Sequence, residues 1–207
     1  MSERAMPNHA AAADAEQLDD DEEDTALFGF WIFLMSDAVI FALLFATYGT
    51  MTLATAGGPT AASEFKLLPT FIETLLLLTS SVTFGRASIA MKYDEPRRSL
   101  FLWLFVTLGL GLAFLAFELK DFADMFADGA YPMRSGFLSA FFALVPLHGL
   151  HVLAGCFWLV VMIVQVGVLG LDRRVKLNLL RLGLFWHFLD VVWIAIFSIV
   201  YLGGHGA

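Results

Sequence analysis

The sequence is poor in charge, has almost no cysteine and lacks any dense basic region. Charged residues make up 15% of the 207 positions, whereas a soluble domain has about a quarter. A single cysteine, Cys156, excludes a disulfide scaffold. Nucleic-acid binding is excluded as well, because no group of Lys and Arg is dense enough to neutralise a row of phosphates.

The acidic residues are concentrated at the start of the chain. Nine of the 20 acids precede residue 25, and they account for most of the net charge of −8. These nine are Glu3, Asp14, Glu16, Asp19, Asp20, Asp21, Glu22, Glu23 and Asp24. Like charges repel and keep a chain extended, so we expect residues 1–26 to form an acidic, disordered cytoplasmic tail. The domain proper is then 27–207.

What remains is strongly apolar. The whole chain is 59% hydrophobic, contains 21 Phe and has a mean hydropathy of +0.76. About 20 apolar residues are needed for a helix to cross a hydrocarbon core of about 30 Å, and five segments are long enough. They are 29–53, 68–92, 100–118, 137–169 and 180–202. None alternates as barrel strands do, so the sequence predicts an all-α bundle of five transmembrane helices.

The Lys and Arg residues predict an orientation, because cytoplasmic loops carry an excess of them. Eight basic residues lie on the side of the N-terminus and three on the other side. The eight are Arg4, Lys92, Arg97, Arg98, Arg173, Arg174, Lys176 and Arg181, and the three are Lys66, Lys120 and Arg134. We therefore expect a cytoplasmic N-terminus and a periplasmic C-terminus.

Ionisable residues inside a span are expensive, so each of them is a functional hypothesis. Asp37 in the first span has no basic partner on its own helix. Glu73 and Arg86 in the second span are too far apart to pair, about 20 Å along a helix. The sequence offers no role for Glu73 or Arg86.

Two further pairs have i, i+3 spacing, which places both members on one helix face. They are His148 with His151 and His187 with Asp190. Together with Glu118 they permit a transition-metal site, since imidazole and carboxylate are suitable ligands. They also permit a haem held by two histidines, or a network of interhelical hydrogen bonds that holds the helices in register.

Two classes of function are compatible with these residues taken alone. A free-standing proton-coupled transporter would use the intramembrane carboxylates Asp37, Glu73 and Glu118. The chain has no internal repeat, however, which argues against the common inverted-repeat transporters. A membrane cytochrome would need the histidines for haem.

Four local sequences resemble subunit III of the haem-copper terminal oxidases, and among these the subunit of cytochrome bo-type ubiquinol oxidases. They are Phe30–Asp37, Arg134–Phe142, His148–Val152 and Phe185–Trp193. The resemblance extends from about Phe28 to Leu202. Five spans also suit the quinol oxidases, because subunit III of cytochrome c oxidases typically has seven.

The resemblance implies a subunit without a catalytic site and without a haem, copper or quinone ligand of its own. Haem and copper belong to subunit I, against which this subunit packs. Subunits II and IV and membrane lipids are the other implied partners. The complex would oxidise ubiquinol, reduce dioxygen to water and translocate protons across the bacterial inner membrane.

The resemblance also implies roles for individual residues. Asp37 matches an acid, usually Glu in cytochrome c oxidases, in a lipid-filled cleft near the proton entrance of subunit I. Five others match positions that hold the larger helix group together. They are Glu118, His148, His151, His187 and Asp190.

Overall fold

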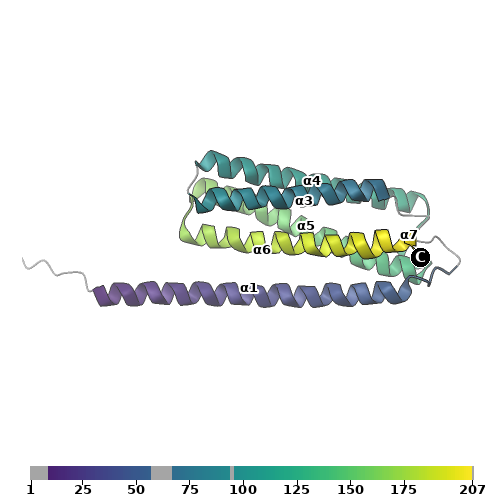
Figure 1. Cartoon of the computed structure of the whole chain (residues 1–207), viewed down its shortest axis with the longest axis horizontal. Coiled ribbons are helices and arrows are strands. Elements are labelled where there is room, and N and C mark those ends of the chain that lie inside the picture. The colour runs from purple at the N-terminus through teal and green to yellow at the C-terminus, as the bar shows by residue number, and fades with distance from the viewer. Residues whose placement is uncertain (1–8, 57–66, 94–95, 207) are drawn as a thin grey trace, which may run out of the picture. The chain divides into compact units, whose positions relative to one another are not determined.

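A computed structural model describes residues 9–56, 67–93 and 96–206, and this part of the chain is helical apart from short connections (Figure 1). The long helices are α1 (His9–Met51), α3 (Leu67–Lys92), α4 (Arg97–Ala127), α5 (Gly136–Val168) and α6 (Arg173–Ile196). Three short elements are η1 (Pro132–Arg134), the π-helix η2 (Phe197–Leu202) and α7 (Gly203–Gly206). Among the described residues, five helical segments are long and apolar enough to cross a membrane. The prediction of an all-α protein with five spans is therefore confirmed.

Two spans are longer than the apolar runs that predicted them. Helix α4 continues past Glu118 to Ala127, and α6 begins at Arg173 rather than near 180. Beyond Glu118 the α4 sequence becomes amphipathic, with Met125 buried among charged neighbours. A helix continues as long as one face can be buried, whereas a run of apolar residues ends at the first charged ones.

The start of the chain also differs from the expectation. Helix α1 begins at His9, so the structure describes residues 9–26 as helical where the sequence suggested an extended tail. Residues 10–13 are all alanine, which has the highest helix propensity. Residues 1–8 of the predicted tail lie outside the described part. The chain divides into two compact units, Met1–Asp37 and Ala38–Ala207.

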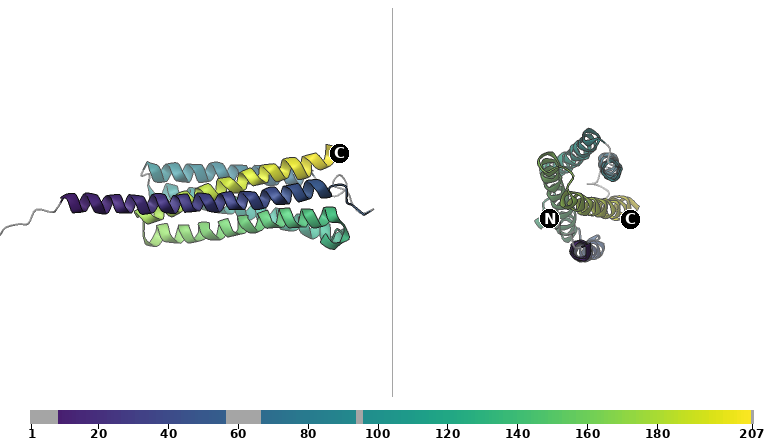
Figure 2. Two further views of the ribbon diagram at one scale, coloured as in Figure 1. Left: turned by 90° about the horizontal axis from the view of Figure 1, so that it is seen from below. Right: turned by 90° about the vertical axis from the view of Figure 1, so that its left-hand side faces the viewer.

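Within the second unit, four helices form a closed bundle. Helix α3 packs along α4, α4 along α5, α5 along α6, and α6 returns against α3. The end-on view in Figure 2 shows these four helices side by side. Short connections between successive helices make neighbours in the sequence antiparallel neighbours in space.

Trp186 occupies the centre of this bundle. A Cβ added to Gly111 on α4 would lie 2.9 Å from its indole, and one added to Gly155 on α5 would lie 3.3 Å from it. The indole Nε1 donates to Ser80 Oγ at 3.0 Å. Lipid tails are as apolar as a protein core, so close packing around small residues and hydrogen bonds hold membrane helices together. Trp186 has both features, because it packs closely against two glycines and donates a hydrogen bond to Ser80.

Candidate functional site

Among the described residues of the membrane spans, five Asp, Glu and His side chains are buried. They are Asp37, Glu73, Glu118, His148 and Asp190. Such residues in a span generally pair with one another or with backbone groups. Their surroundings are described in turn.

Asp37 is the last residue of the first unit and is 6% exposed. Its neighbours along α1, Phe33 and Ile40, are large apolar side chains that are about half exposed. The helix thus carries a buried carboxyl group beside an apolar outer face. The role near a proton entrance that the resemblance implies for Asp37 stays a prediction.

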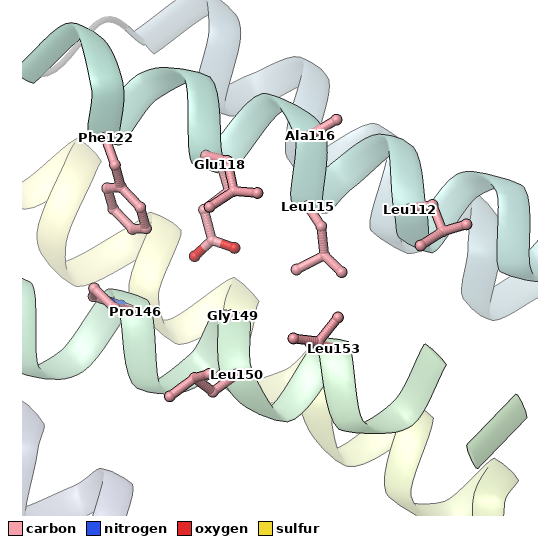
Figure 3. Close-up of a pocket in the computed structure, with 10 residues that line it drawn as sticks. Leu112, Leu115, Ala116, Glu118, Phe122, Pro146, Gly149, Leu150 and Leu153 are labelled. Atoms are coloured by element: carbon pink, nitrogen blue, oxygen red, sulfur yellow. The ribbon is translucent and has the colours of Figure 1, made fainter. Parts of the chain in front are cut away.

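Glu118 points from α4 towards α5 (Figure 3). Its side chain is buried, and its Oε1 has no hydrogen-bond partner among the described residues. A Cβ on Gly149 would lie 2.5 Å from Glu118 Oε2 and 2.8 Å from Oε1. Gly149 is the glycine of the sequence His148–His151. Its lack of a side chain provides the space for this carboxyl group.

An apolar groove of about 520 Å³ lies between α4 and α5 at this position. Its wall is formed largely by leucines, and Figure 3 shows Glu118 between Leu115 and Phe122. From Leu112 to Phe122 the groove extends about 15 Å at 1.5 Å per residue. That is about half of a 30 Å hydrocarbon core. The groove therefore has the length and polarity of one lipid acyl chain.

Glu73 and Glu118 are brought together, a proximity that the sequence analysis missed. Glu73 on α3 is 1% exposed, and it lies within electrostatic range of Glu118 and Asp121 on α4. Tyr201 in η2 is close to the same acids. A signal was present: Glu73 lies near the start of α3 and Glu118 near the end of the antiparallel α4, which gives both carboxyls a similar depth.

The two histidines of α5 have backbone partners instead of each other. His148 is fully buried, with Nε2 at 3.2 Å from the carbonyl oxygen of Leu189 on α6. His151 Nδ1 donates to the carbonyl oxygen of Leu147, one turn earlier, at 2.7 Å. His148 thus joins α5 to α6, as a polar side chain that holds helices in register would do.

His187, which forms an i, i+3 pair with Asp190 on α6, connects α6 to α3. His187 Nδ1 lies 2.7 Å from Ser81 Oγ on α3 and 3.7 Å from Asp190 Oδ2. The predicted network of five residues thus comprises separate contacts: Glu118 with Gly149, His148 with Leu189, and His187 with Ser81 and Asp190. Within the described ranges, no group of three His, Cys, Asp or Glu residues is arranged to hold a metal ion.

The fold defines a membrane protein of five spans whose buried polar groups connect neighbouring helices. Residues 22–205 match the family described as cytochrome c oxidase subunit III. The chain is 46% identical over 184 residues to the cytochrome bo(3) ubiquinol oxidase subunit 3 of Pseudomonas putida, covering 89% of this chain and 88% of the relative. It is 41% identical over 210 residues to the protein of that name from Pseudomonas aeruginosa, covering 99% of both. The chain belongs to the cytochrome c oxidase subunit III family.

Members of this family are subunits of respiratory oxidase complexes and lack a catalytic site. Other oxidase subunits are therefore partners of this chain. The family also includes a cytochrome c oxidase subunit 3 from Alkalihalophilus pseudofirmus, which is 38% identical over 204 residues. The match covers 98% of this chain and 96% of that relative. Chain length therefore does not separate this chain from a relative named as a cytochrome c oxidase subunit.

Proposed function

We propose that this chain is the accessory, non-redox third subunit of a bacterial ubiquinol oxidase of the bo type. The observation that carries the proposal is the 46% identity to a relative named as a ubiquinol oxidase subunit. In the complex, subunit I holds haem and copper, oxidises ubiquinol and reduces dioxygen to water while protons cross the membrane. This chain packs against subunit I and stabilises it, in contact with subunits II and IV.

The excess of Lys and Arg supports a cytoplasmic N-terminus and a periplasmic C-terminus in the inner membrane. Six of the eight basic residues on the cytoplasmic side lie at the end of α3 or in the first turn of α4 or α6, at the same end of the bundle. They are Lys92, Arg97, Arg98, Arg173, Arg174 and Lys176. Arg4 and Lys66, which also entered the count, lie outside the described residues.

Purification of the tagged chain in mild detergent tests the proposed function. We expect a much larger haem-bearing subunit to co-elute and the preparation to oxidise ubiquinol with consumption of dioxygen. A preparation that oxidises reduced cytochrome c but not ubiquinol would assign the chain to the other branch, as the relative from Alkalihalophilus pseudofirmus suggests. A solitary colourless chain would favour a transporter, and haem retained by the separated chain would favour a cytochrome.

We further propose that Asp37 organises lipid headgroups and protons near the proton entrance of subunit I. Two observations support this role, and the predicted orientation is considered with them. The carboxyl group is buried on a helix whose neighbouring side chains are apolar and outward-facing. The α4–α5 groove has the dimensions of an acyl chain, which suits a subunit that retains lipid. The predicted orientation directs the N-terminal end of the span Asp24–Met51 towards the cytoplasm, from which protons enter, and Asp37 lies at the middle of that span.

Replacement of Asp37 by Asn removes the charge with little change in shape. We expect proton uptake by the vesicle-reconstituted complex to fall several-fold, and activity to decline earlier over repeated turnovers. Asp124→Asn is a matched control, because Asp124 is an exposed carboxyl group on α4. Proton uptake, lipid content and activity over many turnovers are the measurements. If all three equal those of the unmodified complex, Asp37 has no such role.

A further inference from the structure

Two carboxyl groups are enclosed within the helix bundle, at the end where α3 begins and α4 ends. Glu73 is 1% exposed and Glu118 is 4% exposed. In each of them, Oε1 has no hydrogen-bond partner among the described residues. An ionised carboxyl group enclosed in this way is very costly unless its charge is neutralised. Because other helices of this chain enclose both side chains, the neutralising group has to be found within the chain.

The ionisable neighbours of this acid pair carry no positive charge. Within the described ranges, neither carboxyl group forms an ion pair with a Lys, Arg or His side chain. Glu118 interacts electrostatically with Glu73, and both interact with Asp121 on α4. Tyr201 in η2 interacts with the same acids, and Tyr48 of α1 interacts with Tyr201. These neighbours are acids and phenols, so none of them offsets a negative charge.

Helix α5, on the other side of Glu118, offers no charge either. It presents Gly149 to the carboxyl group, and the groove beside it is lined largely by leucines (Figure 3). A metal ion would also neutralise the pair, but it needs several ligands. Within the described part of the chain, no three His, Cys, Asp or Glu residues are arranged to hold one.

A third acid lies between this pair and the exposed end of α4. Asp121 follows Glu118 by three residues, which places both on one face of the helix. Asp121 is half-buried, whereas Asp128, at which α4 ends, is exposed. The exposure of the acids therefore rises from Glu118 through Asp121 to Asp128. Asp121 is placed to pass a proton between the enclosed pair and the water at the end of the helix.

We propose that Glu73 and Glu118 form an internal proton-binding site, in which each carboxyl group holds a proton at neutral pH and exchanges it with water through Asp121. A bound proton removes both the cost of enclosing a charge and the repulsion between two carboxylates. In the exchange, a carboxylic acid of the pair gives its proton to the Asp121 carboxylate, which then gives it to water. The site rests on the surroundings of these residues within this chain, so it does not depend on the proposed function.

Infrared spectroscopy of the full chain in lipid vesicles at neutral pH tests the site, because protonated carboxyl groups and carboxylates absorb in separate bands. Glu73→Gln and Glu118→Gln each replace an acid by a neutral group of nearly the same shape. We expect each substitution to remove part of the protonated-carboxyl band, and the double substitution to remove the sum of the two parts. Asp124→Asn is the control, since Asp124 is exposed on α4, and it is expected to leave that band unchanged.

Two infrared results would overturn the site. The unmodified chain would show no protonated-carboxyl band, a result that needs no substitution. Alternatively, either glutamine variant would lose carboxylate absorption and keep the whole protonated band, which would mean that the acid is ionised and held by a cation. Neither measurement involves ubiquinol, dioxygen or another subunit. Failure of the proton site would therefore leave the oxidase assignment intact, and a chain that recovers no oxidase subunits would leave the proton site intact.

Transfer of the vesicles into deuterium oxide tests the role of Asp121. The protonated-carboxyl band shifts as deuterium replaces hydrogen, so the rate of the shift reports proton exchange at the pair. We expect Asp121→Asn to slow this shift several-fold, because an amide does not accept and release a proton as a carboxylate does. Asp124→Asn, the same change at an exposed position on α4, is expected to leave the rate unchanged. Equal rates in the two variants would exclude Asp121 as the route.

Discussion

Replacing Gly111 by valine is expected to destabilise the chain by about 3 kcal/mol, the upper part of the range for overpacking a core. The new Cβ would lie 2.9 Å from the Trp186 indole and 3.0 Å from Cys156 Sγ. The indole has little freedom to yield, because it is buried, packs against Gly155 and donates to Ser80. The measurement is the free energy of unfolding of the purified chain in mixed micelles, titrated with a denaturing detergent.

Gly109→Val is the matched control, two residues earlier on the same helix. An added Cβ there has no atom within 4 Å, so we expect a change near zero. Comparing the two substitutions removes the cost, common to both, of placing a β-branched residue in a helix. Equal destabilisation by both substitutions would show that Trp186 does not fill the space above Gly111.

The comparison of these two glycines shows what the sequence could not provide. Gly109 and Gly111 are equivalent to a reader of the sequence, since both suggest close helix packing. Only the rotation of α4 about its axis decides that Gly111 faces Trp186 and Gly109 faces outwards. That rotation depends on the side chains of α5 and α6, which the local sequence of α4 does not contain.

The five spans, by contrast, were predictable because the bilayer imposes a minimum length on each apolar run. The residues at which the spans begin and end were less predictable. The extension of α4 beyond Glu118 depends on one buried face, including Met125, and a search for apolar runs does not detect an amphipathic face. The alanines at 10–13 likewise favour helix, although the acids that follow suggested a tail.

The polar residues of the spans were identified correctly as unusual, but their partners were not identified. His148 bonds to a backbone carbonyl of α6, and any residue has such a group, so no motif can reveal the pairing. Glu73 had no role in the sequence analysis, yet it lies within electrostatic range of Glu118 and Asp121. Contacts between helices follow from depth and rotation together, and sequence spacing within one helix gives only relative positions on that helix.

The second large expected effect concerns Gly149. The sign of the stability change caused by Gly149→Ala is expected to depend on whether residue 118 is Glu or Ala. Gly149→Ala is expected to destabilise the chain by about 1–3 kcal/mol through overpacking. The Glu118 carboxyl group would lie within 2.5–2.9 Å of the new Cβ. The carboxyl can relieve this contact by rotating into the α4–α5 groove. Because that groove is lined by leucines, the rotation places a polar group against apolar surface, which is costly.

In a chain that already carries Glu118→Ala, the same Gly149→Ala substitution has no carboxyl group to meet. Alanine is more favourable than glycine within a helix by about 1 kcal/mol. We therefore expect Gly149→Ala to be neutral or stabilising in that background. A double-mutant cycle of detergent-unfolding free energies then gives a coupling of about 1–3 kcal/mol, within the range for residues in contact.

Gly109→Ala, measured in both backgrounds, is the control for the cycle, because its position is open and is not among the residues that line the groove. We expect it to give the same small change with Glu118 and with Ala at position 118. A similar cost of Gly149→Ala in the two backgrounds would mean that Glu118 does not occupy the space above Gly149. The glycine of the sequence His148–His151 would then need another explanation. A reversal of sign would instead identify that glycine as the element that admits an ionisable group between α4 and α5.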